Sequence, residues 1–130
     1  MTLPTASLVG LLFAYAPQAN AHLTSLQATT AIVGEAAASP FAVKLAVAHA
    51  LKNRGSLRGV YGLTAAHNHH EPAATWAEAR RAWRLAATTP DNTNGATHFG
   101  NAHDVATGIF YGLEPTAVIG TGNNATYFFK

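Results

Sequence analysis

One glutamate in this chain of 130 residues differs from the other acidic residues in its surroundings. Glu35 lies within an apolar run of small and aliphatic residues, 31–38. Burial among such side chains disfavours the charged carboxylate and raises its pKa, so a proton remains available near neutral pH. A general acid needs such a proton. The other carboxylates fall in predicted loops or on a polar helix face: Glu71, Glu78, Asp91, Asp104 and Glu114.

Glu35 is therefore a candidate general acid, and no second carboxylate has a comparable predicted setting. The alternative is a glutamate that emerges at the helix surface and pairs with Lys44 or an arginine, which is the usual role of a lone helical glutamate. The apolar neighbours of Glu35 weaken this usual interpretation and do not overturn it.

The histidines offer a second kind of chemistry. The tract 67–70 contains three of them, and together with His98 or His103 they could bind zinc and activate water. The H-E-x-x-H spacing of helical zinc sites does not occur in the sequence. We therefore predict neither a metal nor another cofactor, and the residues leave open whether this tract contacts substrate or metal.

Composition limits the classes of protein to which the chain can belong. Hydrophobic residues make up 48% and charged residues 11%, which suits one domain with a compact core rather than an intrinsically disordered chain. The formal net charge of +2 is too small to predict nucleic-acid binding. Without cysteine, disulfides and thiolate catalysis are excluded.

Residues 1–25 form an apolar N-terminal segment that precedes the predicted domain, 26–130. The run 8–14 followed by Ala-Asn-Ala at 19–21 is typical of a signal peptide, although no Lys or Arg precedes it. We favour an uncleaved segment that docks on the domain or on a partner. The run is too short to span a bilayer, which needs about 20 apolar residues.

The domain begins with two predicted helices. The first covers 26–38, with Thr24 or Ser25 as its N-cap. The second begins at Ser39 and Pro40, reaches Asn53 or Arg54, and ends at Gly55. Its predicted core face holds Val43, Val47, Ala50 and Leu51. Its predicted solvent face holds Lys44, His49, Lys52 and Asn53.

The rest of the chain is predicted to form a loop, a third helix and a small sheet. The loop covers 55–71, and Pro72 opens a helix that ends within 88–90. Trp76 and Trp83 fall on its apolar stripe and are predicted core residues. Short strands are predicted at 96–99, 117–119 and 126–129, the last two joined by a Gly/Asn loop. The sum is an α+β fold with a helical body and a small antiparallel sheet.

Four pieces of the sequence carry a family resemblance in their order along the chain. They are AIVGEA at 31–36, VAHALKNR at 47–54, NGATHFGN at 94–101, and IG at 119–120 with TYF at 126–128. The chain thereby resembles, over about 28–130, the cell wall hydrolases of the spore-cortex-lytic (SleB-like) type. These proteins show a "GEA" helix end, a "VLNR"-like helix, a "GATHF-N" segment and an "IG-x-TFY"-like strand.

The resemblance implies a lysozyme-like fold and cleavage of the β-1,4 bond between N-acetylmuramic acid and N-acetylglucosamine in peptidoglycan. Glu35 matches the catalytic glutamate of the family. Lytic transglycosylation, which leaves a 1,6-anhydro product, fits the residues better than hydrolysis, because a typical glycosidase needs two carboxylates. One carboxyl suffices for a transglycosylase, since it can first protonate the leaving oxygen and then deprotonate a hydroxyl of the sugar itself.

Polar residues of the last two family segments are the predicted substrate-binding side chains. Thr97, His98 and Asn101 are expected to offer a hydroxyl, an imidazole and an amide to sugar groups, and Tyr127 to stack on or hydrogen-bond to a sugar. Their alternative roles are turn and sheet hydrogen bonds, and core packing for Tyr127. The sequence departs from the family around 38–39 and between 54 and 72, where the glutamine-phenylalanine cleft segment is not evident.

A non-enzymatic function is the alternative interpretation. The N-terminal segment could dock the domain into a larger assembly such as a phage virion, where it would act as a structural module, a lysin or both. The expected location is therefore facing a cell wall, either by export or in a virion, and the expected partner is the glycan strand.

Overall fold

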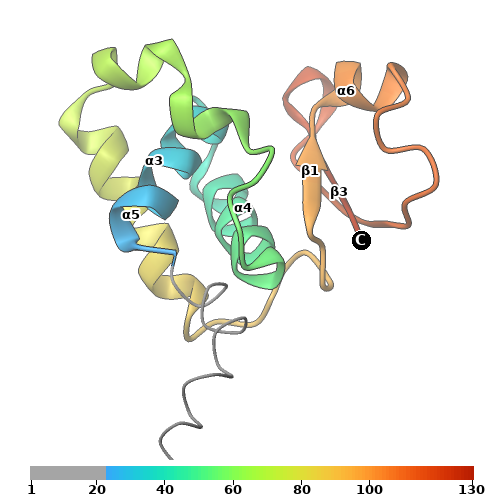
Figure 1. Cartoon of the computed structure of the whole chain (residues 1–130), viewed down its shortest axis with the longest axis horizontal. Helices are drawn as coiled ribbons and strands as arrows, with labels where there is room; N and C mark the ends of the chain where they lie inside the picture. Colours follow the sequence, from blue (N-terminus) through green and yellow to red (C-terminus); the bar gives the residue numbers. More distant parts are fainter. Residues whose placement is uncertain (1–22) are drawn as a thin grey trace, which may run out of the picture.

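A computed structural model describes residues 23–130, which form a mixed α+β fold (Figure 1). This confirms the predicted α+β class. The predicted docking segment, 1–25, lies outside the described residues apart from its last three. The described helices are α3 (Ser25–Ala36), α4 (Phe41–Arg54), α5 (Ala73–Ala86) and α6 (Ala102–Ala106). The strands are β1 (His98–Gly100), β2 (Pro115–Ile119) and β3 (Thr126–Phe129).

Helix α3 carries Glu35 in its last turn. Thr24 caps its N-terminus in a capping box, in which the Thr24 hydroxyl accepts from the Gln27 N–H and the Gln27 side chain accepts from the Thr24 N–H. The predicted cap is therefore confirmed. The helix ends at Ala36, two residues earlier than predicted. Because most of its aliphatic side chains are buried, the glutamate is carried by a well-packed element.

Helix α4 is buried on nearly all sides, which corrects the prediction that Lys44 and His49 face solvent. Both side chains are buried. The Lys44 ammonium donates to the Ser39 carbonyl over 2.6 Å and lies 2.9 Å from the Glu78 carboxylate. The His49 ring is 3.2 Å from the Thr89 hydroxyl. The cause is tertiary packing, since α4 contacts α3 and α5 as well as β1 and β2.

The segment 55–71 is more regular than the predicted loop. It contains two short 3-10 helices, η1 (Tyr61–Thr64) and η2 (Ala66–His70). Both pack on α3. Gly55 takes the left-handed conformation that ends α4, as predicted.

Helix α5 confirms the predicted third helix. Its alanines at 79, 82 and 86 are buried, whereas Trp76 and Trp83 are only half-buried and pack against the edge of the core. One face of the Trp83 ring is covered by the Lys52 ammonium, 3.7 Å from the ring centroid. The tryptophans are thus peripheral core residues rather than central ones.

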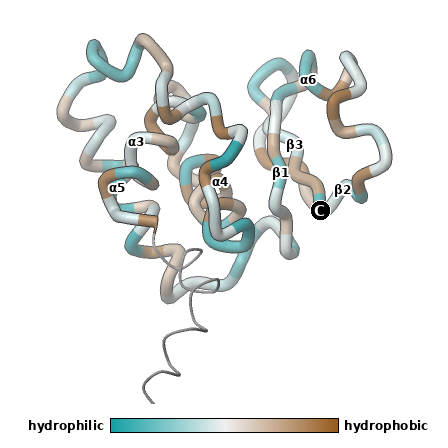
Figure 2. Tube along the Cα trace, viewed as in Figure 1, coloured by the Kyte–Doolittle hydropathy of each residue, from teal (hydrophilic) through white to brown (hydrophobic). Residues whose placement is uncertain are grey.

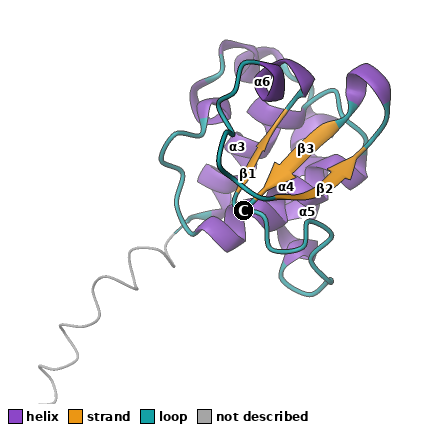
Figure 3. Ribbon diagram, turned by 90° about the vertical axis from the view of Figure 1, so that its right-hand side faces the viewer, coloured by secondary structure: helices purple, strands orange, loops and turns teal. Residues whose placement is uncertain are grey.

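The three strands form an antiparallel sheet in the order β1-β3-β2 (Figure 3). Phe99 of β1 pairs with Phe128 of β3, and Val118 of β2 pairs with Tyr127. The predicted strand positions are confirmed to within a few residues. Figure 1 shows the sheet and α6 on one side of α4, with the other helices on the opposite side.

Helix α6 was not predicted from the sequence. Asn101 caps it, because its side-chain oxygen accepts from the Asp104 N–H over 2.8 Å while the Asp104 carboxylate accepts from the Asn101 N–H over 3.0 Å. The N-x-x-D spacing of Asn101 and Asp104 was the signal in the sequence that could have predicted α6.

Figure 2 shows a hydrophobic stretch directly after α6. In the part of the chain that is described, no helix is long and apolar enough for a membrane span.

Candidate active site

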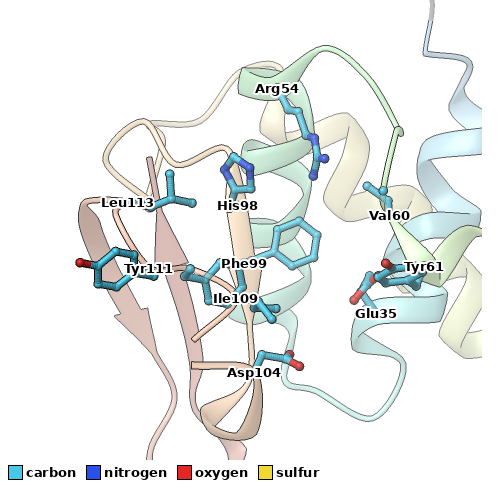
Figure 4. A pocket seen from close by; sticks show the side chains of 12 residues that line it. Glu35, Arg54, Val60, Tyr61, His98, Phe99, Asp104, Ile109, Tyr111 and Leu113 are labelled. Atoms are coloured by element: carbon cyan, nitrogen blue, oxygen red, sulfur yellow. The ribbon is translucent and has the colours of Figure 1, made fainter. Parts of the chain in front are cut away.

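A cleft of about 390 Å³ separates the helical part from the sheet (Figure 4). This volume falls within the range of roughly 300–1,000 Å³ found for small-molecule sites. Residues from both parts line it: Glu35, Arg54, Gly59, Val60, Tyr61, His98, Phe99, Asp104, Ile109, Phe110, Tyr111 and Leu113. The cleft therefore brings together segments that are far apart in the sequence.

Glu35 is held at one wall of this cleft by a backbone hydrogen bond. The N–H of Gly62, in η1, donates to Oε2 of Glu35 over 2.7 Å. Figure 4 shows the carboxylate directed into the cleft, toward the wall formed by β1 and α6. One oxygen is thus fixed while the carboxyl group faces the space in which a ligand would lie.

The environment of Glu35 raises the pKa of its carboxyl group. Burial is the largest cause, and the negative charge of Asp104 adds to it. The Gly62 hydrogen bond and the positive charges of Arg54 and His67 act in the opposite direction without cancelling the rise. Glu35 nevertheless remains exposed to solvent, because it sits in an open cleft where the surrounding protein removes only part of its hydration.

Two glycines allow η1 to come close enough to hold Glu35. A Cβ atom on Gly34 would lie 1.8 Å from the Gly62 carbonyl oxygen, and one on Gly62 would lie 2.6 Å from Cγ of Glu35. No side chain fits at either position without moving the backbone. The buried Asn68 amide donates to the Gly62 carbonyl over 2.9 Å and fixes this contact.

Within the histidine tract 67–70, His67 contacts the backbone next to Glu35. One ring nitrogen of His67 lies 3.0 Å from the Gly34 carbonyl oxygen, and the other lies 2.9 Å from the Glu71 carboxylate. His69 and His70 are exposed. Within residues 23–130, no group of three His, Asp or Glu side chains is arranged to hold a metal ion. The zinc interpretation therefore has no ligand set in this part of the chain.

His98, a predicted substrate-binding residue, lies in the wall opposite Glu35. Its Nδ1 is 3.0 Å from the Thr97 hydroxyl. Burial, followed by the positive charge of Arg54, lowers the pKa of His98, so the ring is neutral near pH 7 and can present a donor or an acceptor to the cleft. Arg54, the last residue of α4, donates to the Arg58 carbonyl and also lines the cleft.

Asp104 is a second carboxylate in the same cleft, which the sequence analysis did not predict. Figure 4 shows it on the wall opposite Glu35. Its position depends on Gly100, because a Cβ there would lie 2.8 Å from the Asp104 carboxylate. This corrects the prediction that no second carboxylate has a setting comparable to that of Glu35.

The other predicted binding residues have different positions. Thr97 and Tyr127 do not line the cleft; Thr97 supports His98, and Tyr127 is half-buried in β3, the central strand. Asn101 is exposed and caps α6, which was its alternative role. It also lines a second depression that includes Glu35.

Several cleft residues were missed by sequence reasoning. Arg54 was visible only as part of the "VLNR"-like segment. Tyr61, Ile109 and Tyr111 line the cleft although their side chains are 84%, 63% and 95% exposed. Exposed apolar side chains at a cleft are typical of a binding surface. No periodic pattern marks them, because they lie on short turns.

Comparisons with protein-family models, with curated protein sequences and with solved structures find no match for this chain.

Proposed function

We propose that this protein cleaves the β-1,4 bond between N-acetylmuramic acid and N-acetylglucosamine, as a lytic transglycosylase with Glu35 as its acid/base. The observation that carries the proposal is the placement of Glu35, which combines an oriented carboxyl group, a raised pKa and a cleft wide enough for a sugar. A lysozyme-like fold belongs to the same proposal. It is supported by a glutamate at the end of a helix that faces a small sheet across a cleft.

The proposed reaction needs one proton that Glu35 first gives and then recovers. The Glu35 carboxyl group protonates the glycosidic oxygen, and the bond from that oxygen to C1 of N-acetylmuramic acid breaks. The C6 hydroxyl of the same sugar attacks C1 and loses its proton to the Glu35 carboxylate. A 1,6-anhydro ring forms, no water is consumed, and the enzyme returns to its starting state.

The neighbouring side chains suit the charge changes of this reaction. Asp104 adds a negative charge to a cleft in which the transition state carries positive charge on the sugar ring. The same charge helps to keep Glu35 protonated before the reaction. The exposed rings of Tyr61 and Tyr111 offer surfaces on which sugar rings can stack.

Asp104 also supports a second candidate function, hydrolysis by a pair of carboxylates. In that reaction Asp104 would activate water or attack C1, and the product would have a reducing end. The two reactions share the acid role of Glu35 and differ in their products.

Release of soluble fragments from dye-labelled, purified peptidoglycan tests the shared claim. We expect release by the wild-type protein and at least a 100-fold loss in Glu35→Gln, because general acid catalysis contributes about 10²–10⁴-fold. Glu114→Gln is the matched control, since Glu114 is exposed and does not line the cleft. No release by the wild type would favour the structural-module interpretation.

A further inference from the structure

A second depression adjoins the cleft at Glu35. Its volume is about 370 Å³, close to that of the cleft itself. It lies between the turn that follows α3 and the loop that joins β2 to β3. The lining residues are Glu35, Ala38, Ser39, Pro40, Asn101, Asn123, Asn124, Ala125 and Thr126. Glu35 is the residue that the two spaces share, so a ligand that passes the carboxyl group can occupy both.

The chemistry of this depression differs from that of the cleft. Among residues 23–130, Glu35 is the charged residue that lines it, and three of the other lining residues are asparagines. Asn123 and Asn124 are exposed at its rim, and each amide offers both a donor and an acceptor. The apolar surface comes from small residues such as Ala38 and Ala125. Such a surface suits a neutral ligand with amide and hydroxyl groups.

The cleft differs from the depression in charge, because a positively charged side chain lies at the end of the cleft opposite Asp104. Among the described residues that line the cleft, Arg54 is the one with a positively charged side chain near pH 7. Figure 4 shows Arg54 and Asp104 at opposite ends of the cleft. Asp104 adjoins the amide-lined depression through its hydrogen bond with Asn101, which lines that depression. Among residues 23–130, the arginine that lines the cleft therefore lies on the side away from the asparagines.

The two sugars of peptidoglycan also differ in charge. N-acetylmuramic acid carries a lactyl group that ends in a carboxylate or in an acidic peptide, whereas N-acetylglucosamine is neutral. Resting on the proposed function, we infer that the strand crosses Glu35 in one direction, with N-acetylglucosamine in the amide-lined depression and N-acetylmuramic acid in the cleft beside Arg54. The depression is thus a binding site for a neutral N-acetylhexosamine, and Asn123 and Asn124 determine its specificity.

Binding measurements on the Glu35→Gln protein test this inference without cleavage. The probes are a neutral N-acetylglucosamine tetramer and a tetrasaccharide of alternating N-acetylglucosamine and N-acetylmuramic acid, each titrated calorimetrically. We expect Asn123→Ala with Asn124→Ala to weaken binding of both probes about 10- to 100-fold, because two hydrogen-bonding groups are lost. Thr121→Ala is the matched control, since Thr121 is exposed in the same loop and does not line the depression.

Arg54→Gln provides the second arm. It should weaken binding of the alternating tetrasaccharide several-fold and leave binding of the neutral tetramer unchanged. Retained affinity in the double asparagine variant, equal losses for both probes in Arg54→Gln, or no binding of either probe would overturn the inference. Fragment release by the wild type, measured in parallel, distinguishes a failure of the proposed strand direction from a failure of the proposed function. If peptidoglycan is cleaved and the asparagines do not matter, the strand direction is wrong and the proposed function stands.

Discussion

Gly34 and Gly62 touch through their backbones, and a Cβ atom on Gly34 would lie 1.8 Å from the Gly62 carbonyl oxygen. This contact places the Gly62 N–H 2.7 Å from the Glu35 carboxylate. The orientation of the proposed acid therefore depends on two residues that have no side chains.

Gly34→Ala should disturb the site through this contact. The added methyl group must push η1 away from α3, which we expect to destabilise the protein by about 1–3 kcal/mol and to loosen the Gly62 hydrogen bond. Urea unfolding and fragment release measure the two effects. A variant with wild-type stability and wild-type activity would show that the glycine contact does not position Glu35.

Asp104→Asn should move the pH dependence of activity. The negative charge of Asp104 contributes to the raised pKa of Glu35, so its removal lowers that pKa and the acid loses its proton at a lower pH. The basic limb of the pH–rate profile should therefore shift to lower pH. Asparagine can still accept the Asn101 N–H, which preserves the cap of α6. An unchanged basic limb would exclude an electrostatic role of Asp104 toward Glu35.

Glu35→Gln should stabilise the protein at neutral pH while it removes activity. Folding raises the Glu35 pKa above 4.5, so protonation of Glu35 stabilises the folded state at low pH. This stabilisation is lost as pH rises through the folded pKa. Glutamine is neutral at every pH and can accept the Gly62 N–H. The melting temperature of the variant should exceed that of the wild type at pH 7, and the two should converge near pH 4. A lower melting temperature of the variant at pH 7 would contradict a raised pKa of Glu35 in the folded protein.

Asp91→Asn should destabilise the turn that leads into β1. Burial raises the pKa of Asp91, yet hydrogen bonds from Thr93, Asn53 and Gly95 outweigh this and lower it from 3.8 to about 2. The ionised form therefore stabilises the fold above pH 3.8, and this stabilisation is lost as pH falls through about 2. We expect a loss of about 2 kcal/mol at pH 7 that shrinks with acidification. An equal loss at pH 7 and pH 2 would rule out a role for the charge.

Local signals in the sequence were sufficient to predict most of the helices and strands. Thr24, Gly55 and the apolar stripe of α5 act within one or two helical turns, so caps and periodicity could be read directly. The same holds for the loop that joins β2 and β3. The isolated glutamate in its apolar run also pointed to the residue that now lines the cleft.

Long-range packing explains what the sequence could not predict. Lys44 and His49 are buried because α4 lies between α5 and the sheet, a property that helical periodicity does not contain. Asp104 lines the same cleft as Glu35 because β1 and α6 face the end of α3 across it. The tyrosines at 61 and 111 lie on short turns, where no pattern predicts the direction of a side chain.

The most direct test of the central claim is mass spectrometry of the muropeptides released from purified peptidoglycan by the wild type and by Glu35→Gln. The proposal predicts 1,6-anhydro muropeptides from the wild type and essentially none from the variant. Reducing ends in place of anhydro ends would instead assign hydrolysis and a reacting role to Asp104. Equal release by both proteins, or release by neither, would contradict the assignment of Glu35 as the acid of a peptidoglycan-cleaving enzyme.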